Sequence, residues 1–356
     1  MIPVSKPFLP EPALYNSYLE GIWKRHWLTN NGPLVQDLEQ QLKKYLGVKH
    51  LIFVNNGTIA LQIALKALNR RGDIITTPFS YVATTNTILW EGCRPVFADV
   101  QHSDFNIDPE LIEKLITPQT VAILATHVYG NPCNIGAIEE IANRHQLTVI
   151  YDGAHAFGAS YNGKQILAYG DISTCSFHAT KVFHCVEGGA IITNNDQLAE
   201  IMTHYRQFGH KGDDYFTIGI NGKNSEFHAA MGLCLLPMME QFIARRKQLT
   251  EYYDSLLNDL SLQRPIALPG TTYNYSYYPV ILDSEERLIR IKTLLEQQGI
   301  LARRYFYPSL NQLPQYTGES CPVSESISLR ALALPLFYDL KEAEVARICD
   351  LVKSCF

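Results

Sequence analysis

A lysine that follows a strand pattern is the residue with the clearest chemical use. Lys181 ends the segment 176–181, SFHATK, and the triplet 187–189, EGG, follows it shortly afterwards. An amine that is partly desolvated loses its proton more easily, so such a lysine can form a Schiff base or move protons. The residue type alone does not separate this role from that of an ordinary solvated surface charge.

Two further polar residues follow another strand pattern. Asp152 comes directly after the apolar run 148–151, and His155 lies three residues later. Side chains at the carboxyl ends of parallel strands lie where ligands bind in such sheets. Two ordinary roles stay open, because Asp152 could cap the next helix and His155 could be a packed, hydrogen-bonded histidine.

A third group lies at the start of two helical patterns. Gly57 and Thr58 stand between a strand and a helix, where backbone N–H groups can bind a phosphate. Thr58 could equally be the helix N-cap. Tyr81 begins the next helical pattern, and its ring could stack on a planar ligand or fill the core.

The order of these residues along the chain is more informative than any of them alone. A phosphate-binding turn comes first, then an aromatic residue, an acid and a lysine, each beside a strand end. This order is typical of a site for pyridoxal phosphate (PLP), in which an aspartate keeps the pyridine nitrogen protonated.

The segments between these residues predict how they are positioned. Short apolar runs predict strands at 51–54, 73–77, 95–100, 121–128, 148–151, 172–177 and 189–193. Helical spacing predicts helices at 58–68, 80–90, 109–115 and 135–145. Strands that alternate with helices and are apolar throughout predict an α/β fold with a parallel sheet covered on both faces.

The pattern changes after about residue 227. A long helical stretch, 227–248, is interrupted by Pro237, and the segments 276–282, 287–298 and 343–355 predict a smaller α+β unit. We therefore predict a large domain of residues 1–240, with an N-terminal arm, and a small domain of residues 241–356.

The composition limits the class of protein. The chain has 356 residues, 46% hydrophobic content and a net charge of −5, without a basic run, which fits a globular enzyme and argues against nucleic-acid binding. No secretory signal and no apolar run of roughly 20 residues is evident. Eight scattered cysteines predict free thiols in the cytoplasm, and the dispersed histidines predict no metal site.

Several short motifs together resemble a known family. They are WLT at 27–29 with GP at 32–33, NGT at 56–58, YVAT at 81–84, HVYG at 127–130, DGAH at 152–155 and SFHATK at 176–181 with EGG at 187–189. In these motifs the chain resembles the DegT/StrS-type sugar-nucleotide aminotransferases over nearly its whole length. The resemblance implies the PLP-transferase (aspartate aminotransferase-like) fold, with a mostly parallel seven-stranded sheet and a smaller C-terminal α+β domain.

The resemblance also implies roles for single residues. Lys181 would bind PLP as a Schiff base and then act as acid and base, and Asp152 would pair with the pyridine nitrogen. The other PLP contacts implied are Gly57, Thr58 and Ser176 at the phosphate, Tyr81 and His155 at the ring, and Asn221, from segment 219–221, at the phosphate of the second subunit of a homodimer. Members of the family often carry an arginine and then Met or Leu after this asparagine, whereas this chain has Lys223 and Asn224.

The expected reaction moves an amino group from L-glutamate to a nucleotide-linked keto sugar. The N-terminal stretch and the segment 303–308, RRYFYP, are most similar to enzymes that act on dTDP-4-keto-6-deoxyglucose and form dTDP-4-amino-4,6-dideoxyglucose for O-antigen or other surface glycans. Arg303 or Arg304 could pair with the diphosphate, or both could be surface charges.

Four alternatives stay open on the sequence. They are a 3-keto sugar aminotransferase, a dehydratase of the same scaffold, a non-catalytic protein that binds PLP or a sugar nucleotide, and an unrelated nucleotide-binding enzyme. Lys181 argues against the dehydratase, in which histidine replaces the lysine. Residues 158–164 have P-loop spacing, but Gln165 replaces the required Ser or Thr.

Overall fold

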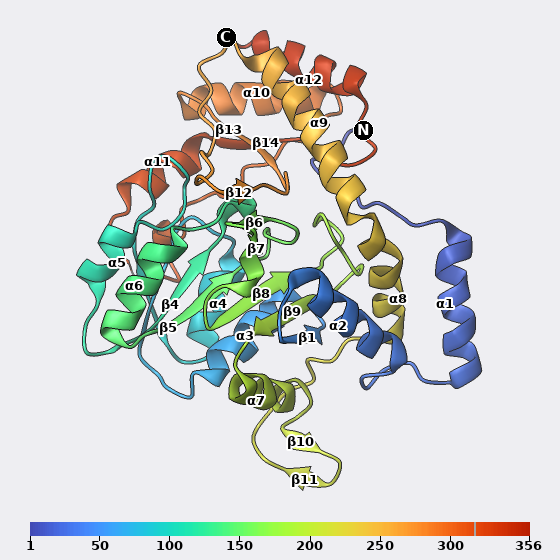
Figure 1. Cartoon of the computed structure of the whole chain (residues 1–356). Helices are drawn as coiled ribbons and strands as arrows, with labels where there is room; N and C mark the ends of the chain where they lie inside the picture. Colours follow the sequence, from blue (N-terminus) through green and yellow to red (C-terminus); the bar gives the residue numbers. More distant parts are fainter. Residues whose placement is uncertain (317) are drawn as a thin grey trace.

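Seven strands form the central sheet, in the order β1-β9-β8-β5-β4-β2-β3, in the computed structural model of the chain, which describes residues 1–316 and 318–356 (Figure 1). The neighbours from β8 to β3 are paired parallel, whereas β9 is antiparallel to both β8 and β1. The prediction of a mostly parallel seven-stranded sheet is therefore confirmed. The strands are β1 (His50–Val54), β2 (Asp73–Thr76), β3 (Arg94–Phe97), β4 (Thr120–Thr126), β5 (Thr148–Asp152), β8 (Ile172–Ser176) and β9 (Gly189–Thr193).

Helices cover both faces of this sheet. Successive residues of β1 alternate between the faces, as strand geometry requires: Leu51 and Phe53 pack into one hydrophobic cluster, and Ile52 and Val54 into another. The first face packs against α2 (Pro33–Leu46), α5 (Pro109–Leu115), α6 (Ile135–His145) and α8 (Glu226–Leu235). The second face packs against α3 (Gly57–Ala67), α4 (Val82–Trp90) and α7 (Asp196–Arg206).

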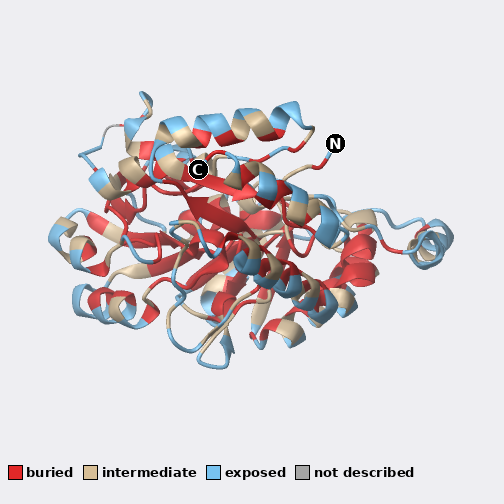
Figure 2. Ribbon diagram, turned by 90° about the horizontal axis from the view of Figure 1, so that it is seen from above, coloured by how far each residue is buried: buried red, intermediate tan, exposed pale blue. Residues whose placement is uncertain are grey.

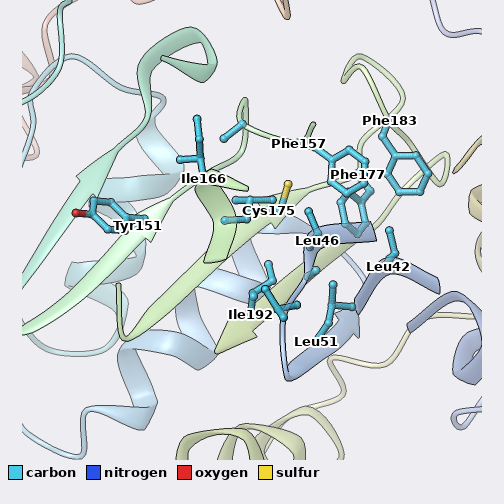
Figure 3. Close-up of a cluster of buried hydrophobic side chains, with 14 of the residues drawn as sticks. Leu42, Leu46, Leu51, Tyr151, Phe157, Ile166, Cys175, Phe177, Phe183 and Ile192 are labelled. Atoms are coloured by element: carbon cyan, nitrogen blue, oxygen red, sulfur yellow. The ribbon is translucent and has the colours of Figure 1, made fainter. Parts of the chain in front are cut away.

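The sheet forms the most deeply buried layer of the molecule. Figure 2 shows buried strands at the centre and helices whose inner sides are buried and outer sides exposed. In the first cluster, apolar side chains from α2, β1 and β9 meet rings from the segments that follow β5 and β8, among them Phe157 and Phe177 (Figure 3). This packing fixes the strand ends that carry the candidate site.

The C-terminal part forms a second, smaller core. The antiparallel pair β13 (Tyr278–Ile281) and β14 (Ala331–Leu334) packs against α9 (Met239–Leu257), α10 (Glu285–Gln297) and α12 (Glu342–Lys353). Helix α9 contributes Phe242 to the core of the large sheet and Tyr253 to the small one. A boundary after residue 240 falls at the start of this shared helix and stays a proposal.

The remaining elements lie around these two cores. Helix α1 (Pro12–Arg25) stands at one side, and the hairpin of β10 (His210–Lys211) and β11 (Asp214–Tyr215) projects beyond α7 (Figure 1). The others are β6 (Ser160–Tyr161), β7 (Lys164–Gln165) and β12 (Thr271–Thr272), the helix α11 (Pro322–Arg330), and the 3₁₀ turns η1 (Val128–Gly130), η2 (Ile166–Ala168), η3 (Leu236–Met238) and η4 (Leu310–Gln312).

One helical stretch is long and apolar enough to cross a membrane by length and composition. It runs over Glu226–Leu257 and joins α8, η3 and α9, and 56% of its most apolar window is buried inside the protein. Such burial is typical of a core helix of a folded domain, so this stretch gives no support to a membrane segment.

Candidate active site

A pocket of about 290 Å³ lies at the carboxyl ends of the parallel strands. The segments that follow β1, β2, β5 and β8 supply one part of its wall, and another part consists of Tyr277, Arg303, Tyr305 and Phe306. It brings together seven of the eight residues that the sequence predicts for PLP binding: Gly57, Thr58, Tyr81, Asp152, His155, Ser176 and Lys181. Their roles remain predictions, but their convergence is what a shared ligand requires.

Lys181 lies in the turn after β8 and is only partly accessible, on the side of the pocket. Burial lowers its pKa, and the nearby Tyr305 and Asp152 partly oppose this effect. Within the described residues, no carboxylate lies within salt-bridge distance, 4.0 Å, of its amine. A larger share of this amine is therefore neutral, and hence nucleophilic, than in a solvated lysine.

Asp152 ends β5 and is buried, with 5% of its surface exposed. Its Oδ2 accepts a hydrogen bond of 2.7 Å from the Thr84 hydroxyl, and its Oδ1 accepts one of 3.0 Å from the Ala154 N–H. Burial raises the pKa of the carboxyl, whereas these two donors and the charge of Lys181 lower it. The donors hold the carboxylate in one orientation beside the pocket.

His155 presents a neutral ring to the pocket. Burial lowers its pKa well below the ordinary value, and the positive charge of Lys181 lowers it further. The ring stacks on Phe306, with centroids 5.6 Å apart, and meets the edge of Tyr277 at 4.8 Å. Its Nδ1 is buried, and none of the described residues provides a hydrogen-bond partner for it. A flat ligand with a polar substituent would complete this surface.

The N-terminus of α3 forms the other end of the pocket. Asn56 caps this helix by accepting the N–H of Ile59 at 2.8 Å, so of the two roles left open for Thr58 the N-cap is taken by another residue, and Thr58 is exposed. A Cβ added to Gly57 would lie 3.0 Å from the Cβ of Ser176, which leaves little space for a larger residue. Helix N-terminal N–H groups and nearby hydroxyls of this kind suit a phosphate.

The aromatic residue begins its helix slightly differently from the prediction. The pattern predicted a helix from residue 80, whereas α4 starts at Val82 and Tyr81 is its N-cap. Tyr81 is 55% exposed and lines the pocket, so its ring is free to stack on a ligand.

Asn221 is the predicted residue that does not line the pocket of its own chain. It is exposed and forms a backbone bridge to Gln207, next to the base of the β10–β11 hairpin. The neighbouring Lys223 places its amine 4.3 Å from the ring centroid of Phe208. Contact of Asn221 with a second subunit stays a prediction.

The two candidate arginines have different environments. Arg304 binds Glu285 at 2.8 Å and donates to the carbonyls of Ser328 and Leu329, which commits it to the small core. Arg303 lines the pocket, with its guanidinium 4.5 Å from the ring centroid of Tyr305, and the described residues offer it no acidic partner. Of these two arginines, Arg303 is therefore the one that can bind an anion in the pocket.

Sequence patterns alone missed several lining residues. Tyr277 stands next to β13, more than 90 positions from Lys181, and no local pattern connects the two. Thr84 belongs to the motif at 81–84, but its bond to Asp152 depends on how α4 is turned. His178 also lines the pocket, and its Nε2 lies 3.6 Å from the carboxylate of Glu187.

Comparison with known proteins gives a consistent result. The sequence profile of the DegT/DnrJ/EryC1/StrS aminotransferase family matches residues 13–353. A protein of Escherichia coli named dTDP-4-amino-4,6-dideoxy-D-glucose transaminase is 41% identical over 367 residues, covering 99% of this chain and 98% of that protein. A protein of the same name from Shigella dysenteriae is 42% identical, with the same coverage. A GDP-perosamine synthase of Vibrio cholerae is 32% identical and covers 100% of this chain and 99% of its own length.

Solved structures are similar over the same span. DesI, crystallised in the presence of its TDP-sugar product, superposes with a TM-score of 0.95 at 30% identity and covers 99% of this chain and 92% of its own. Helicobacter pylori PseC, an aminotransferase involved in the biosynthesis of pseudoaminic acid, gives a TM-score of 0.92 at 28% identity, with coverage of 100% and 99%.

Proposed function

The chain belongs to the DegT/DnrJ/EryC1/StrS aminotransferase family, and from this premise we propose that it is a PLP-dependent enzyme that transfers the amino group of L-glutamate to dTDP-4-keto-6-deoxyglucose. Sugar aminotransferase activity follows from the family itself. The observation that carries the proposed chemistry is the desolvated Lys181 beside the buried Asp152 in one pocket.

The residues of the pocket fit PLP. The exposed helix N-terminus at Gly57 and Thr58 suits its phosphate, the unpartnered Nδ1 of His155 suits a polar ring substituent, and the carboxylate of Asp152 suits a protonated pyridine nitrogen. When bound, PLP supplies a carbonyl carbon that takes up the amino group and a ring that accepts electrons. Lys181 would hold it covalently, with Ser176 at the phosphate and Tyr81 against the ring.

The mechanism requires a neutral amine at Lys181 and an ionised carboxylate at Asp152. Burial lowers the pKa of the Lys181 amine, so this amine can accept the proton that leaves the α-carbon of the amino donor and pass it on to the cofactor. Asp152 has to stay ionised to attract a positive ring, and the Thr84 and Ala154 donors favour that state. The neutral ring of His155 adds no competing charge.

The choice of sugar substrate rests on the relatives and on one side chain. The two proteins at 41% and 42% identity carry the name of a dTDP-4-amino-4,6-dideoxy-D-glucose transaminase. Arg303 is available to pair with an anionic group of the substrate, such as the diphosphate. The names of the relatives also favour a place in the synthesis of a surface glycan such as O-antigen lipopolysaccharide.

We further propose that the enzyme works in the cytoplasm as a homodimer with shared sites. The eight free cysteines are all buried, which suits a reducing compartment. The end of the β10–β11 hairpin and the residues that lead from it to Asn221 expose Tyr215, Phe216 and Ile218, at 77%, 59% and 85%, and a second subunit would cover such apolar side chains.

The first test is an absorbance spectrum of the purified protein with PLP, before and after L-glutamate is added without a keto sugar. We expect a yellow PLP band that converts to the pyridoxamine form with glutamate. A protein that binds no PLP would contradict the proposed cofactor. A PLP band that does not change when glutamate is added would contradict the proposed donor. It would favour the non-catalytic binding protein.

The second test offers the pyridoxamine form a panel of keto sugars. We expect the band to return with dTDP-4-keto-6-deoxyglucose, and more slowly with GDP-linked and UDP-linked 4-keto sugars. Return of the band only with a 3-keto sugar, or only with a different nucleotide, would overturn the substrate assignment and leave the glutamate half-reaction standing.

A further inference from the structure

We propose that three buried hydroxyl groups, those of Thr126, Ser80 and Thr84, form a one-way chain of donors that ends on Asp152 and positions its carboxylate for the cofactor. The proposal rests on the PLP assignment made above. It makes Thr84 the decisive positioning residue, with Ser80 and Thr126 acting through it.

The chain is continuous and enclosed. The Thr84 hydroxyl lies 2.7 Å from Asp152 Oδ2, the Ser80 hydroxyl lies 2.7 Å from that of Thr84, and the Thr126 hydroxyl lies 3.1 Å from that of Ser80. Thr84 is fully buried, and Ser80 and Thr126 are 2% and 3% exposed. Three elements meet here, because Ser80 follows β2, Thr84 lies on α4 and Thr126 ends β4 beside Asp152 of β5.

The direction of the chain follows from counting protons. An ionised carboxylate only accepts hydrogen bonds, so Thr84 must give its single hydroxyl proton to Asp152. Thr84 can then only accept from Ser80, and Ser80, whose proton is now used, can only accept from Thr126. Every O–H therefore points toward Asp152, and dipoles aligned in this way strengthen one another in a low-dielectric interior.

This arrangement opposes the effect of burial on Asp152. Burial raises the pKa of its carboxyl, and the Thr84 hydroxyl is the first of the influences that lower it. The pocket that contains Asp152 is also lined by the titratable side chains of Arg303, His178 and Glu187. Three further titratable groups lie near its carboxyl: Lys181 in the turn after β8, Cys175 of β8, and His155. Burial raises the pKa of Cys175 to about 12 and lowers that of His155, so Lys181 is the one nearby cation in this set. Loss of the hydroxyl chain would leave Asp152 with the Ala154 N–H and with Lys181, whose pKa burial lowers.

Three variants on α4 separate this role from simple packing, and a fourth, Ser80→Ala, tests the next link of the chain. Thr84→Val removes the hydroxyl at nearly constant shape, and Thr84→Ser keeps it. Thr87→Val is the matched control, since Thr87 is a buried threonine of the same helix whose hydroxyl, among the residues that the structure describes, bonds only to the carbonyls of Ala83 and Thr84. Each protein is stripped of cofactor and titrated with PLP, and ¹⁵N NMR of ring-labelled PLP then reports protonation of the pyridine nitrogen.

We expect Thr84→Val to raise the Kd for PLP roughly tenfold, the effect of one charge-assisted hydrogen bond, and to move the ¹⁵N shift toward the unprotonated form. Thr84→Ser and Thr87→Val should bind PLP like the original protein. Ser80→Ala should fall between, since it leaves the last bond of the chain in place.

Two results would overturn the proposal. One is a Thr84→Val protein with an unchanged Kd and an unchanged ¹⁵N shift. The other is a Thr84→Ser protein as impaired as Thr84→Val, which would assign the effect to packing. Failure of the unaltered protein to bind PLP at all would instead refute the proposed cofactor, so the two failures are distinguishable.

Discussion

The burial of the Lys181 amine lowers the stability of the folded protein, and the same burial suits the proposed role of this amine. Burial lowers its pKa below its ordinary value of 10.5, so the unfolded chain binds this proton more tightly than the folded one. Unfolding therefore becomes less favourable as pH rises from the folded pKa toward 10.5, and at neutral pH the buried amine is destabilising. Functional groups held in this way commonly reduce stability.

Lys181→Met should separate activity from stability. The variant removes the nucleophile and the acid/base group, so we expect turnover to fall at least roughly 10³-fold. The cofactor-free variant should melt about 2–4 °C higher than the original protein at pH 7, and the gap should shrink by pH 10. Thermal melts of the cofactor-free proteins at both pH values measure this. A variant that melts lower at both would show that the lysine contributes structural contacts.

The adjacent arginines should give opposite phenotypes. Arg303→Gln removes a pocket cation that pairs with no acidic side chain in the described part of the chain, so we expect the KM for the sugar nucleotide to rise about tenfold or more with little change in Tm. Arg304→Gln breaks the contact to Glu285 and two carbonyls, so we expect a Tm lower by about 2–4 °C and an unchanged KM. Steady-state kinetics and melts of both variants check this. The reverse pattern would exchange their roles.

At the scale of elements, the sequence predicted strands better than side-chain directions. The apolar run 148–151 predicts β5 nearly to its last residue, because a parallel strand is apolar on both faces. The antiparallel direction of β9 is not visible locally, since strand patterns carry no direction. The Thr84 contact to Asp152 is also hidden, because it depends on the packing of α4 over the sheet and not on spacing within the motif. Tyr277 reaches the pocket only through tertiary folding.

One buried carboxylate connects the N-terminal helices α1 and α2 to α8. Helix α2 begins after Gly32, which has no capping side chain, and Glu226 of α8 fills that place by accepting the N–H groups of Leu34 and Val35 at 3.0 and 2.9 Å. Glu226 is fully buried, and Arg25 lies 3.6 Å from its carboxylate. A negative charge at a helix N-terminus is stabilising, and here it also joins two helices.

Replacement of this carboxylate should destabilise the fold. Glu226→Gln keeps the shape but removes the charge and brings an amide donor toward backbone donors, so we expect a loss of about 2 kcal/mol and a Tm lower by about 4–8 °C. Chemical denaturation and thermal melts measure the change. Glu240→Gln, at an exposed position near the start of α9, is the control and should have little effect. Equal losses in both variants would contradict the capping role.

At the scale of the molecule, the pocket needs both cores. The large sheet supplies Lys181 and Asp152, and the segments next to the small core supply Tyr277 and Arg303. Arg303 is held by a backbone bridge to Ala333 of β14, so the small core sets its position. Substitutions that loosen either core should therefore change the geometry of the pocket. Asn221 is a separate case, because it lies outside the pocket of its own chain.

A heterodimer tests whether the site is completed by a second subunit. Asn221→Asp places a negative charge where the partner's cofactor phosphate is expected, and Lys181→Ala removes the reactive amine, so each homodimer should be nearly inactive. If Asn221 acts across the interface, a heterodimer of the two variants has one site with both changes and one with neither. Purified through two different affinity tags, it should show about half the activity of the original dimer. If Asn221 acts within its own chain, each of the two sites has one defect, and the heterodimer stays as inactive as its parents.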